Sequence, residues 1–209
     1  MNDSRLSELL VDGISQLGLS VTEKQLKQLV AYKDILLRWN KVYSLTAITN
    51  PRELIIQHLL DGLSLVAHIP ANARVLDVGS GMGVPGIILA VMLPESNVTV
   101  LDSNSKKSAF LQQVKIELNL NNLSVVCKRV ELYKPDQLFT SITSRAFADL
   151  ALFIRLTEHL LADNGLYQAM KAERGLNEMK EIDGFACRQT ELNVPYLDAK
   201  RFLIEMKRR

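Results

Sequence analysis

The sequence predicts an α/β protein in which helices wrap a mostly parallel sheet. From Arg74 onward, short apolar and β-branched runs alternate with helical segments, as in a parallel sheet with crossover helices. The last two apolar runs lack a long helix between them, which favours a hairpin that adds one antiparallel strand. We therefore expect a seven-stranded sheet, with strands over 74–78, 98–102, 123–127, 139–143, 166–171, 185–193 and 201–207, and helices over 85–93, 105–119 and 149–162.

Residues 1–70, before this alternation, show helical patterns and few strand signals. Between Thr22 and Trp39 the apolar residues fall on one helical face, and Thr22 can cap that helix. A second helix is expected to start at Pro51, with an inner face of Leu54, Ile55, Leu59 and Leu63. We expect 1–70 to be a helical extension packed on a ligand-binding domain of residues 71–209.

Composition limits the class of protein. With 209 residues, of which 47% are hydrophobic, the chain can build one domain with a good core and an appendage. The net charge of +2 does not by itself demand a nucleic-acid partner. No apolar run is long enough to span a membrane, and the N-terminus lacks a signal-peptide pattern. Cys127 and Cys187 lack metal-ligand spacing, so we expect a cytoplasmic protein without a metal site.

The most informative motif follows the first predicted strand, Val75–Val78. Gly79, Gly81 and Gly83 allow a tight turn and a close approach to a ligand, and Pro85 fits the start of the next helix. A nucleotide-like ligand at that helix start is the default interpretation. Residues 81–86 also match G-x-G-x-x-G, which taken alone is a weak signal for a dinucleotide.

The kind of nucleotide depends on Asp77, inside the end of this strand. A carboxylate beside the helix start disfavours a dianionic pyrophosphate, and with it an NAD-dependent oxidoreductase. The same carboxylate suits S-adenosylmethionine, which has no phosphate and carries a cationic sulfonium and an amino group. This strand and glycine pattern is typical of Rossmann-like methyltransferases, so we expect Asp77, Gly79 and Gly81 at an S-adenosylmethionine site.

A second carboxylate, Asp102, ends the next predicted strand. An acid at that position can accept both ribose hydroxyls of an adenosyl group, in NAD and S-adenosylmethionine sites alike. Alternatively, Asp102 caps the following helix, a role that Ser103 or Ser105 can also fill. We favour ribose binding because the glycine turn lies upstream.

Three further positions follow strand ends, where ligands bind in such sheets. Val130 and Glu131 follow the third strand, where this fold normally reads the adenine, although a plain surface loop is equally compatible. Arg145 follows the fourth strand and can bind a phosphate or the methionine carboxylate, or form a salt bridge beside a helix. Lys171 ends the fifth strand and can contact a nucleic-acid backbone or simply be solvated.

The fourth predicted strand lacks the motif that enzymes methylating the exocyclic amines of bases carry at its end. Enzymes that methylate exocyclic amines of bases usually carry Asn/Asp-Pro-Pro-aromatic there, and this chain has Ile142–Arg145 instead. It has no Pro-Cys pair for attack on a pyrimidine ring and no obvious general base. These absences are compatible with guanine N7, which has no proton to lose, so that positioning and tolerance of developing charge are the main catalytic tasks.

The chain resembles the ribosomal RNA small subunit methyltransferase G family, also called glucose-inhibited division protein B, over nearly its whole length. The stretches that carry the resemblance are 39–47, 58–63, 77–87, 101–103 and 144–147. Its most specific parts are Val84-Pro85-Gly86 and Ser144-Arg145-Ala146-Phe147. Ser44 and Ala172 depart from the family, which usually has Asn and often has Gly there.

The resemblance implies a Rossmann-like class I methyltransferase that methylates N7 of one guanine in 16S ribosomal RNA, in the 530-loop region near the decoding centre. It implies S-adenosylmethionine as methyl donor, Gly79 and Val84 lining its pocket, Val130 and Glu131 on the adenosine side, and Arg145 completing the site as its catalytic residue. The implied partner is 16S ribosomal RNA or the small ribosomal subunit, and we expect a monomer. A methyltransferase for a small molecule or protein, or a binding-only role, stays open.

RNA binding would require local patches, because the net charge is small. Basic candidates are Lys106, Lys107, Lys115, Lys128, Arg129 and residues 207–209, although a charge cluster is more often a solvated face. Tyr32, Trp39 and Tyr43 can stack on a splayed base, but Trp39 fits the core better. His58 and Asp61 share a helix face and can pair at the mouth of the pocket, while a structural role for His58 is the simpler interpretation.

Overall fold

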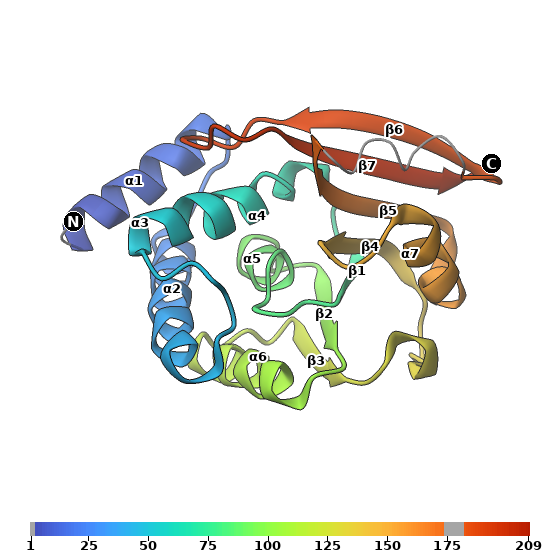
Figure 1. Ribbon diagram of the computed structural model, residues 1–209, viewed down its shortest axis with the longest axis horizontal. Helices are drawn as coiled ribbons and strands as arrows, with labels where there is room; N and C mark the ends of the chain where they lie inside the picture. Colours follow the sequence, from blue (N-terminus) through green and yellow to red (C-terminus); the bar gives the residue numbers. More distant parts are fainter. Residues whose placement is uncertain (1–2, 174–181) are drawn as a thin grey trace.

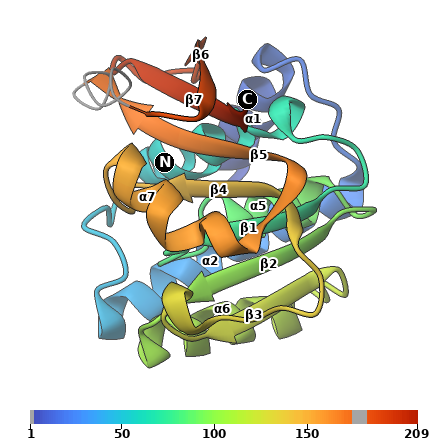
Figure 2. The same cartoon turned by 90° about the vertical axis from the view of Figure 1, so that its right-hand side faces the viewer.

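The computed structural model describes residues 3–173 and 182–209 and contains a seven-stranded sheet. The strand order is β3-β2-β1-β4-β5-β7-β6, which Figure 2 shows from β3 at the bottom to β6 at the top. The strands are β1 Arg74–Val78, β2 Asn97–Asp102, β3 Leu123–Cys127, β4 Phe139–Arg145, β5 Leu161–Ala172, β6 Phe185–Leu192 and β7 Arg201–Arg208.

Strand direction matches the prediction. Strands β1 to β5 pair in parallel, whereas β7 is antiparallel to both β5 and β6. The predicted hairpin with one antiparallel strand is therefore confirmed. Because β7 runs backwards, its first residue, Arg201, lies beside Ala172 at the carboxyl end of β5.

The N-terminal segment, which precedes the first strand of the sheet, consists of helices. Helix α1 covers Asp3–Gln16, and α2 covers Glu23–Tyr43 and begins with a capping box between Thr22 and Gln25, as the sequence predicts for Thr22. The next helix starts at Pro51, also as predicted. It runs through α3 Pro51–Leu54, a π-helical turn Ile55–Leu60 and α4 Asp61–Leu63, and is followed by a 3₁₀ turn Val66–His68.

Two apolar cores lie on the two faces of the sheet. In Figure 1, helices α1 to α6 occupy one side of the sheet, including α5 Gly86–Met92 and α6 Ser105–Glu117. Their core includes Leu36, Leu59, Val75 and Val100, so helices before β1 and the strands share one apolar cluster. On the other face, α7 Leu150–Thr157 packs Phe153 against the second core. Within the described residues, no helix is long and apolar enough to cross a membrane.

Candidate active site

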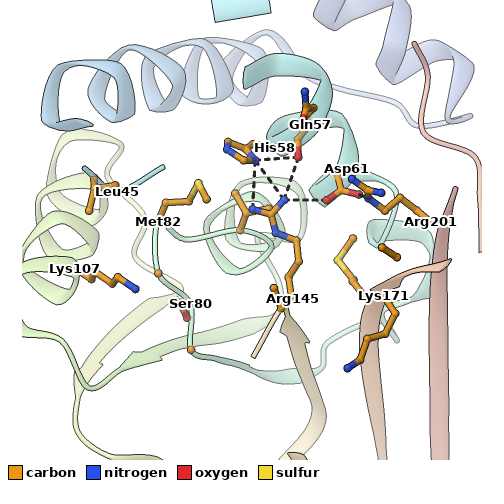
Figure 3. A pocket seen from close by; sticks show the side chains of 16 residues that line it. Leu45, Gln57, His58, Asp61, Ser80, Met82, Lys107, Arg145, Lys171 and Arg201 are labelled. Atoms are coloured by element: carbon orange, nitrogen blue, oxygen red, sulfur yellow. Dashed lines mark hydrogen bonds and ion pairs between the residues drawn. The ribbon is translucent and has the colours of Figure 1, made fainter. Parts of the chain in front are cut away.

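A cavity of about 460 Å³ opens at the carboxyl ends of β1, β4 and β5. Its walls come from the glycine turn after β1, the π-helical turn and the start of α6. The last residues of β4 and β5 and the first residue of β7 complete them (Figure 3). The described residues that line it are Leu45, Gln57, His58, Asp61, Gly79, Ser80, Gly81, Met82, Val84, Lys107, Arg145, Ala146, Met170, Lys171, Ala172 and Arg201. Of the predicted cofactor residues, Gly79, Gly81, Val84 and Arg145 are therefore brought together.

The glycine turn is held against β2 by backbone hydrogen bonds. The amides of Gly79 and Ser80 both donate to the carbonyl of Leu101, at 2.9 and 3.1 Å. Gly79 has a φ of +66°, and a β-carbon added there would come within 2.5 Å of the Phe147 ring. Both the left-handed backbone and the close ring therefore require glycine at position 79.

Asp77 lies beneath this turn and is not part of the cavity wall. Its side chain is buried, Oδ2 accepts the amide hydrogen of Gly86 at 3.0 Å, and Oδ1 has no hydrogen-bond partner among the described residues. Burial raises its pKa to about 6, and the bond from Gly86 partly opposes that rise. The first amide of α5 is thus already bound to a carboxylate, which leaves an unfavourable place for a pyrophosphate.

Asp102 connects the glycine turn to the segment that leads into α6. Its Oδ2 accepts from the amide of Gly81 at 3.0 Å, its Oδ1 accepts from the amide of Asn104 at 2.8 Å, and Lys107 Nζ lies 4.0 Å away. The cap of α6 is Asn104, whose side chain accepts from two amides of the first turn. The alternative in which Asp102, Ser103 or Ser105 caps that helix is therefore wrong.

Arg145 reaches from the end of β4 to the π-helical turn, where a cluster of polar groups surrounds it (Figure 3). Its Nη1 donates to the carbonyl of Gln57 at 3.0 Å and to Asp61 Oδ2 at 2.9 Å, and lies 3.4 Å from His58 Nδ1. These partners fix the guanidinium at the cavity wall. The predicted alternative, a salt bridge, is thus also present, but it crosses between two elements of the site.

Asp61 connects two arginines. Only 2% of its side chain is exposed, and its second oxygen, Oδ1, lies 3.3 Å from Arg201 Nε in an ion pair. Sequence reasoning missed Arg201 as a site residue. The signal was the predicted antiparallel strand, because the start of a reversed strand lies beside the carboxyl ends of its parallel neighbours.

His58 does not pair with Asp61 in the way the helix spacing suggested; its contacts are with Thr46 and Arg145. Its Nε2 lies 2.8 Å from Thr46 Oγ1, and burial together with the nearby Arg145 charge lowers its pKa to about 4. His58 is consequently neutral at pH 7. This supports the interpretation of His58 as a satisfied structural histidine.

Several predicted residues lie outside the cavity. Val130 is buried in the second core and Glu131 is exposed, in a 3₁₀ turn that does not line the cavity. Tyr32 is fully buried and donates to the carbonyl of Met82 at 2.6 Å, so it cannot stack on a base. Apolar packing draws the side chains of Val130 and Tyr32 into the two cores, whereas Glu131 stays on the surface.

Some of the basic residues predicted to bind RNA line the cavity and others lie away from it. Lys107 and Lys171 line the cavity, and Lys171 Nζ donates to the carbonyl of Ala148 at 2.6 Å. Residues 207–209 lie at the opposite end of the sheet, because β7 is antiparallel, and Arg208 pairs there with Glu158 and Asp163. Residues 207–209 therefore lie away from the cavity, and their contact with RNA stays a prediction.

The two departures from the family pattern have simple structural settings. Ser44 ends α2 in the left-handed conformation with a φ of +50°, a conformation that asparagine also tolerates well. Ala172 lines the cavity at the last position of β5, and its φ is not positive, so glycine is not required there.

Comparisons with known proteins agree with this geometry. Residues 25–204 match the model of the GidB family, described as rRNA small subunit methyltransferase G. A protein from Chromobacterium violaceum named ribosomal RNA small subunit methyltransferase G is 47% identical over 199 residues, which covers 94% of this chain and 95% of that protein. One of the same name from Burkholderia ambifaria is 48% identical over 214 residues, covering 99% and 94%.

Solved structures share the fold at low sequence identity. A SAM-dependent methyltransferase from Aquifex aeolicus gives a TM-score of 0.58 at 14% identity, covering 82% of this chain and 97% of that one. TYW2 of M. jannaschii, solved in complex with AdoMet, gives 0.56 at 15% identity, covering 73% and 76%. The expected Rossmann-like class I methyltransferase fold is thereby confirmed.

Proposed function

Because this chain belongs to the rRNA small subunit methyltransferase G family, we propose that it methylates N7 of a single guanine of 16S ribosomal RNA, in the 530-loop region near the decoding centre. The observation that supports this proposal is the charge of the residues that line the cavity. Among the described residues that line it, four are cationic, Lys107, Arg145, Lys171 and Arg201, and one is a carboxylate, Asp61. Such an excess of positive charge beside a glycine turn favours an RNA phosphate backbone near the cofactor.

The glycine turn fits S-adenosylmethionine, the methyl donor of this proposal. A β-carbon at Gly81 would meet only the carbonyl of Gly79, at 3.8 Å, so the backbone there is open to a ligand. Asp77 lies buried beneath the same turn, where its Oδ2 accepts from the amide of Gly86 and so fixes the start of α5. We assign the cofactor to Gly79, Gly81 and Val84, with Asp77 and Asp102 fixing the turn.

The protein's task in this reaction is orientation. S-adenosylmethionine, when bound, supplies an electrophilic methyl group, and guanine N7 offers a lone pair without a proton to remove. The reaction then needs no general base. This agrees with the setting of His58, whose Nε2 already has Thr46 Oγ1 as its hydrogen-bond partner. Arg145 is preset by Gln57 and Asp61 to bind an anionic group at the cavity wall without further ordering.

The proposal includes a monomer acting in the cytoplasm. The proposed substrate, small-subunit ribosomal RNA, is found in the cytoplasm.

Methyl transfer from labelled S-adenosylmethionine tests this function. We expect label to enter 16S RNA or small subunits from a strain that lacks the enzyme, and little label to enter RNA from a strain that has it. Calorimetry should show binding of S-adenosylhomocysteine and no binding of NAD. Equal labelling of both RNAs would refute the target, and binding of NAD alone would refute the cofactor.

A further inference from the structure

Three aromatic rings contact one another in a row that runs from the core to the surface. Phe110 of α6 is fully buried and meets Trp39 edge to face, with ring centroids 5.7 Å apart and an interplanar angle of 62°. Trp39 stacks on Tyr43, the last residue of α2, at 5.1 Å and an interplanar angle of 29°. Tyr43 is 43% exposed. Since Trp39 covers one side of the Tyr43 ring, the stack ends in a supported ring that faces solvent.

The chain that follows Tyr43 is fixed in place. The amide of Ser44 donates to the carbonyl of Asn40 at 3.2 Å and ends α2. The Asn40 side chain then bonds both backbone groups of Thr46, at 2.9 and 2.8 Å. A ring held by a stack on one side and a braced turn on the other loses little conformational entropy when a ligand binds to it.

The backbone that carries this ring leads within two residues to the cavity wall. Leu45, two residues after Tyr43, lines the cavity, and Thr46 contacts the cavity residue His58. Three lysines lie on the two helices, α2 and α6, whose aromatic rings meet in this row. Lys41 is exposed, and Lys106 and Lys107 lie one helical turn before Phe110 in α6, with Lys107 on the cavity wall.

We propose that Tyr43 is a stacking platform for an unpaired base of the RNA substrate, flanking the nucleotide that enters the cavity, while Lys41, Lys106 and Lys107 face its phosphates. An exposed aromatic ring among cations is how proteins bind single-stranded nucleic acid, because every base has a flat face that can stack. The cations favour RNA over an apolar protein partner. This inference rests on the proposed function, which supplies the RNA.

Substitutions at Tyr43 separate stacking from mere apolar contact. Tyr43→Phe keeps the ring and removes the hydroxyl, whereas Tyr43→Leu keeps apolar volume and removes the flat face. Tyr196→Leu is a matched control, because Tyr196 is 42% exposed, does not line the cavity and contacts Gln16 and Asp12 of α1 instead. Thermal unfolding followed by circular dichroism checks that each variant folds.

The readout is methyl-transfer kinetics with small subunits and 16S RNA from a strain that lacks the enzyme. Tyr43→Leu should raise the KM for RNA by about 5- to 160-fold, the range for loss of one stacked base, and leave the affinity for S-adenosylhomocysteine unchanged. Tyr43→Phe and Tyr196→Leu should match the wild type. A wild-type KM for RNA in Tyr43→Leu, or an equal rise in Tyr196→Leu, overturns the inference alone. A wild-type protein that binds S-adenosylhomocysteine but methylates no RNA overturns the proposed function as well.

Discussion

For single residues of the site, sequence patterns predict the position along a strand but not the contacts that the side chain makes. A strand-end pattern predicts that Asp77 and Asp102 lie at one sheet edge, and both do. It does not predict which backbone amides their oxygens accept from, because that depends on how the glycine turn folds over them. Val130 illustrates the same limit, since its position after β3 is predictable and its burial in the second core is not.

Neutral His58 should make stability depend on pH. Its pKa is about 4 in the folded protein and 6.5 ordinarily, so the unfolded chain binds the extra proton between these values. The stability that this neutral histidine provides is therefore complete above pH 6.5 and is lost as the pH falls toward 4. Asp77, with a raised pKa of about 6, opposes this trend in wild type.

Comparison with His58→Gln isolates the contribution of His58. Urea unfolding from pH 4.5 to 7 should show that the wild type gains stability over the variant as pH rises, by at most about 1.4 kcal/mol per pH unit. The matched control His159→Gln changes an exposed histidine and should leave the curve parallel to wild type. A parallel curve for His58→Gln would contradict the assignment of a neutral, buried His58.

Elements of the fold meet at Asp61. This carboxylate of α4 binds Arg145 at the end of β4 and Arg201 at the start of β7, so it joins three walls of the cavity. The sequence predicts all three elements and their order. It does not predict the π-helical turn Ile55–Leu60, which precedes Asp61 and provides the Gln57 carbonyl that Arg145 binds, because apolar spacing alone does not distinguish a π turn from an α-helix.

Removal of this carboxylate should weaken the whole cluster. Asp61→Ala leaves two largely buried arginines without their shared partner, and we expect a loss of about 3–5 kcal/mol in the free energy of unfolding. In the double variant Asp61→Ala/Arg201→Leu the loss should be smaller than the sum of the single losses. Glu23→Ala, which breaks the exposed pair with Lys27, is the control and should cost little. Additive losses in the double variant would show that the two residues do not interact.

The whole molecule behaves as one packed unit in its described residues. Apolar side chains from α1, α2 and the π-helical turn share a core with β1 and α5, and the Tyr32 hydroxyl bonds the carbonyl of Met82 in the glycine turn. The sequence predicts the two segments and the overall topology. Arg201 and residues 207–209 lie at opposite ends of β7, and the antiparallel direction of this strand places Arg201 at the cavity. The sequence predicts one antiparallel strand in the hairpin but not which of its two strands it is.

This shared core gives a prediction for a shortened chain. Residues 71–209 alone would expose apolar side chains such as Val84 and Ile88, against which Gly62 packs in the full chain. We expect this fragment to unfold without a cooperative thermal transition and to bind no S-adenosylhomocysteine. A cooperative transition together with full-length affinity would instead show that residues 71–209 form an independent domain.

Mapping the methylated nucleotide tests whether this protein methylates guanine N7 at one position of 16S RNA. RNA methylated in vitro by this protein is reduced with borohydride and cleaved with aniline, which breaks the chain at N7-methylguanosine, and the break is located by primer extension. We predict one new break, in the 530-loop region, absent when S-adenosylmethionine is omitted. Transfer of label to the RNA without a new break, or breaks at many guanines, would contradict it.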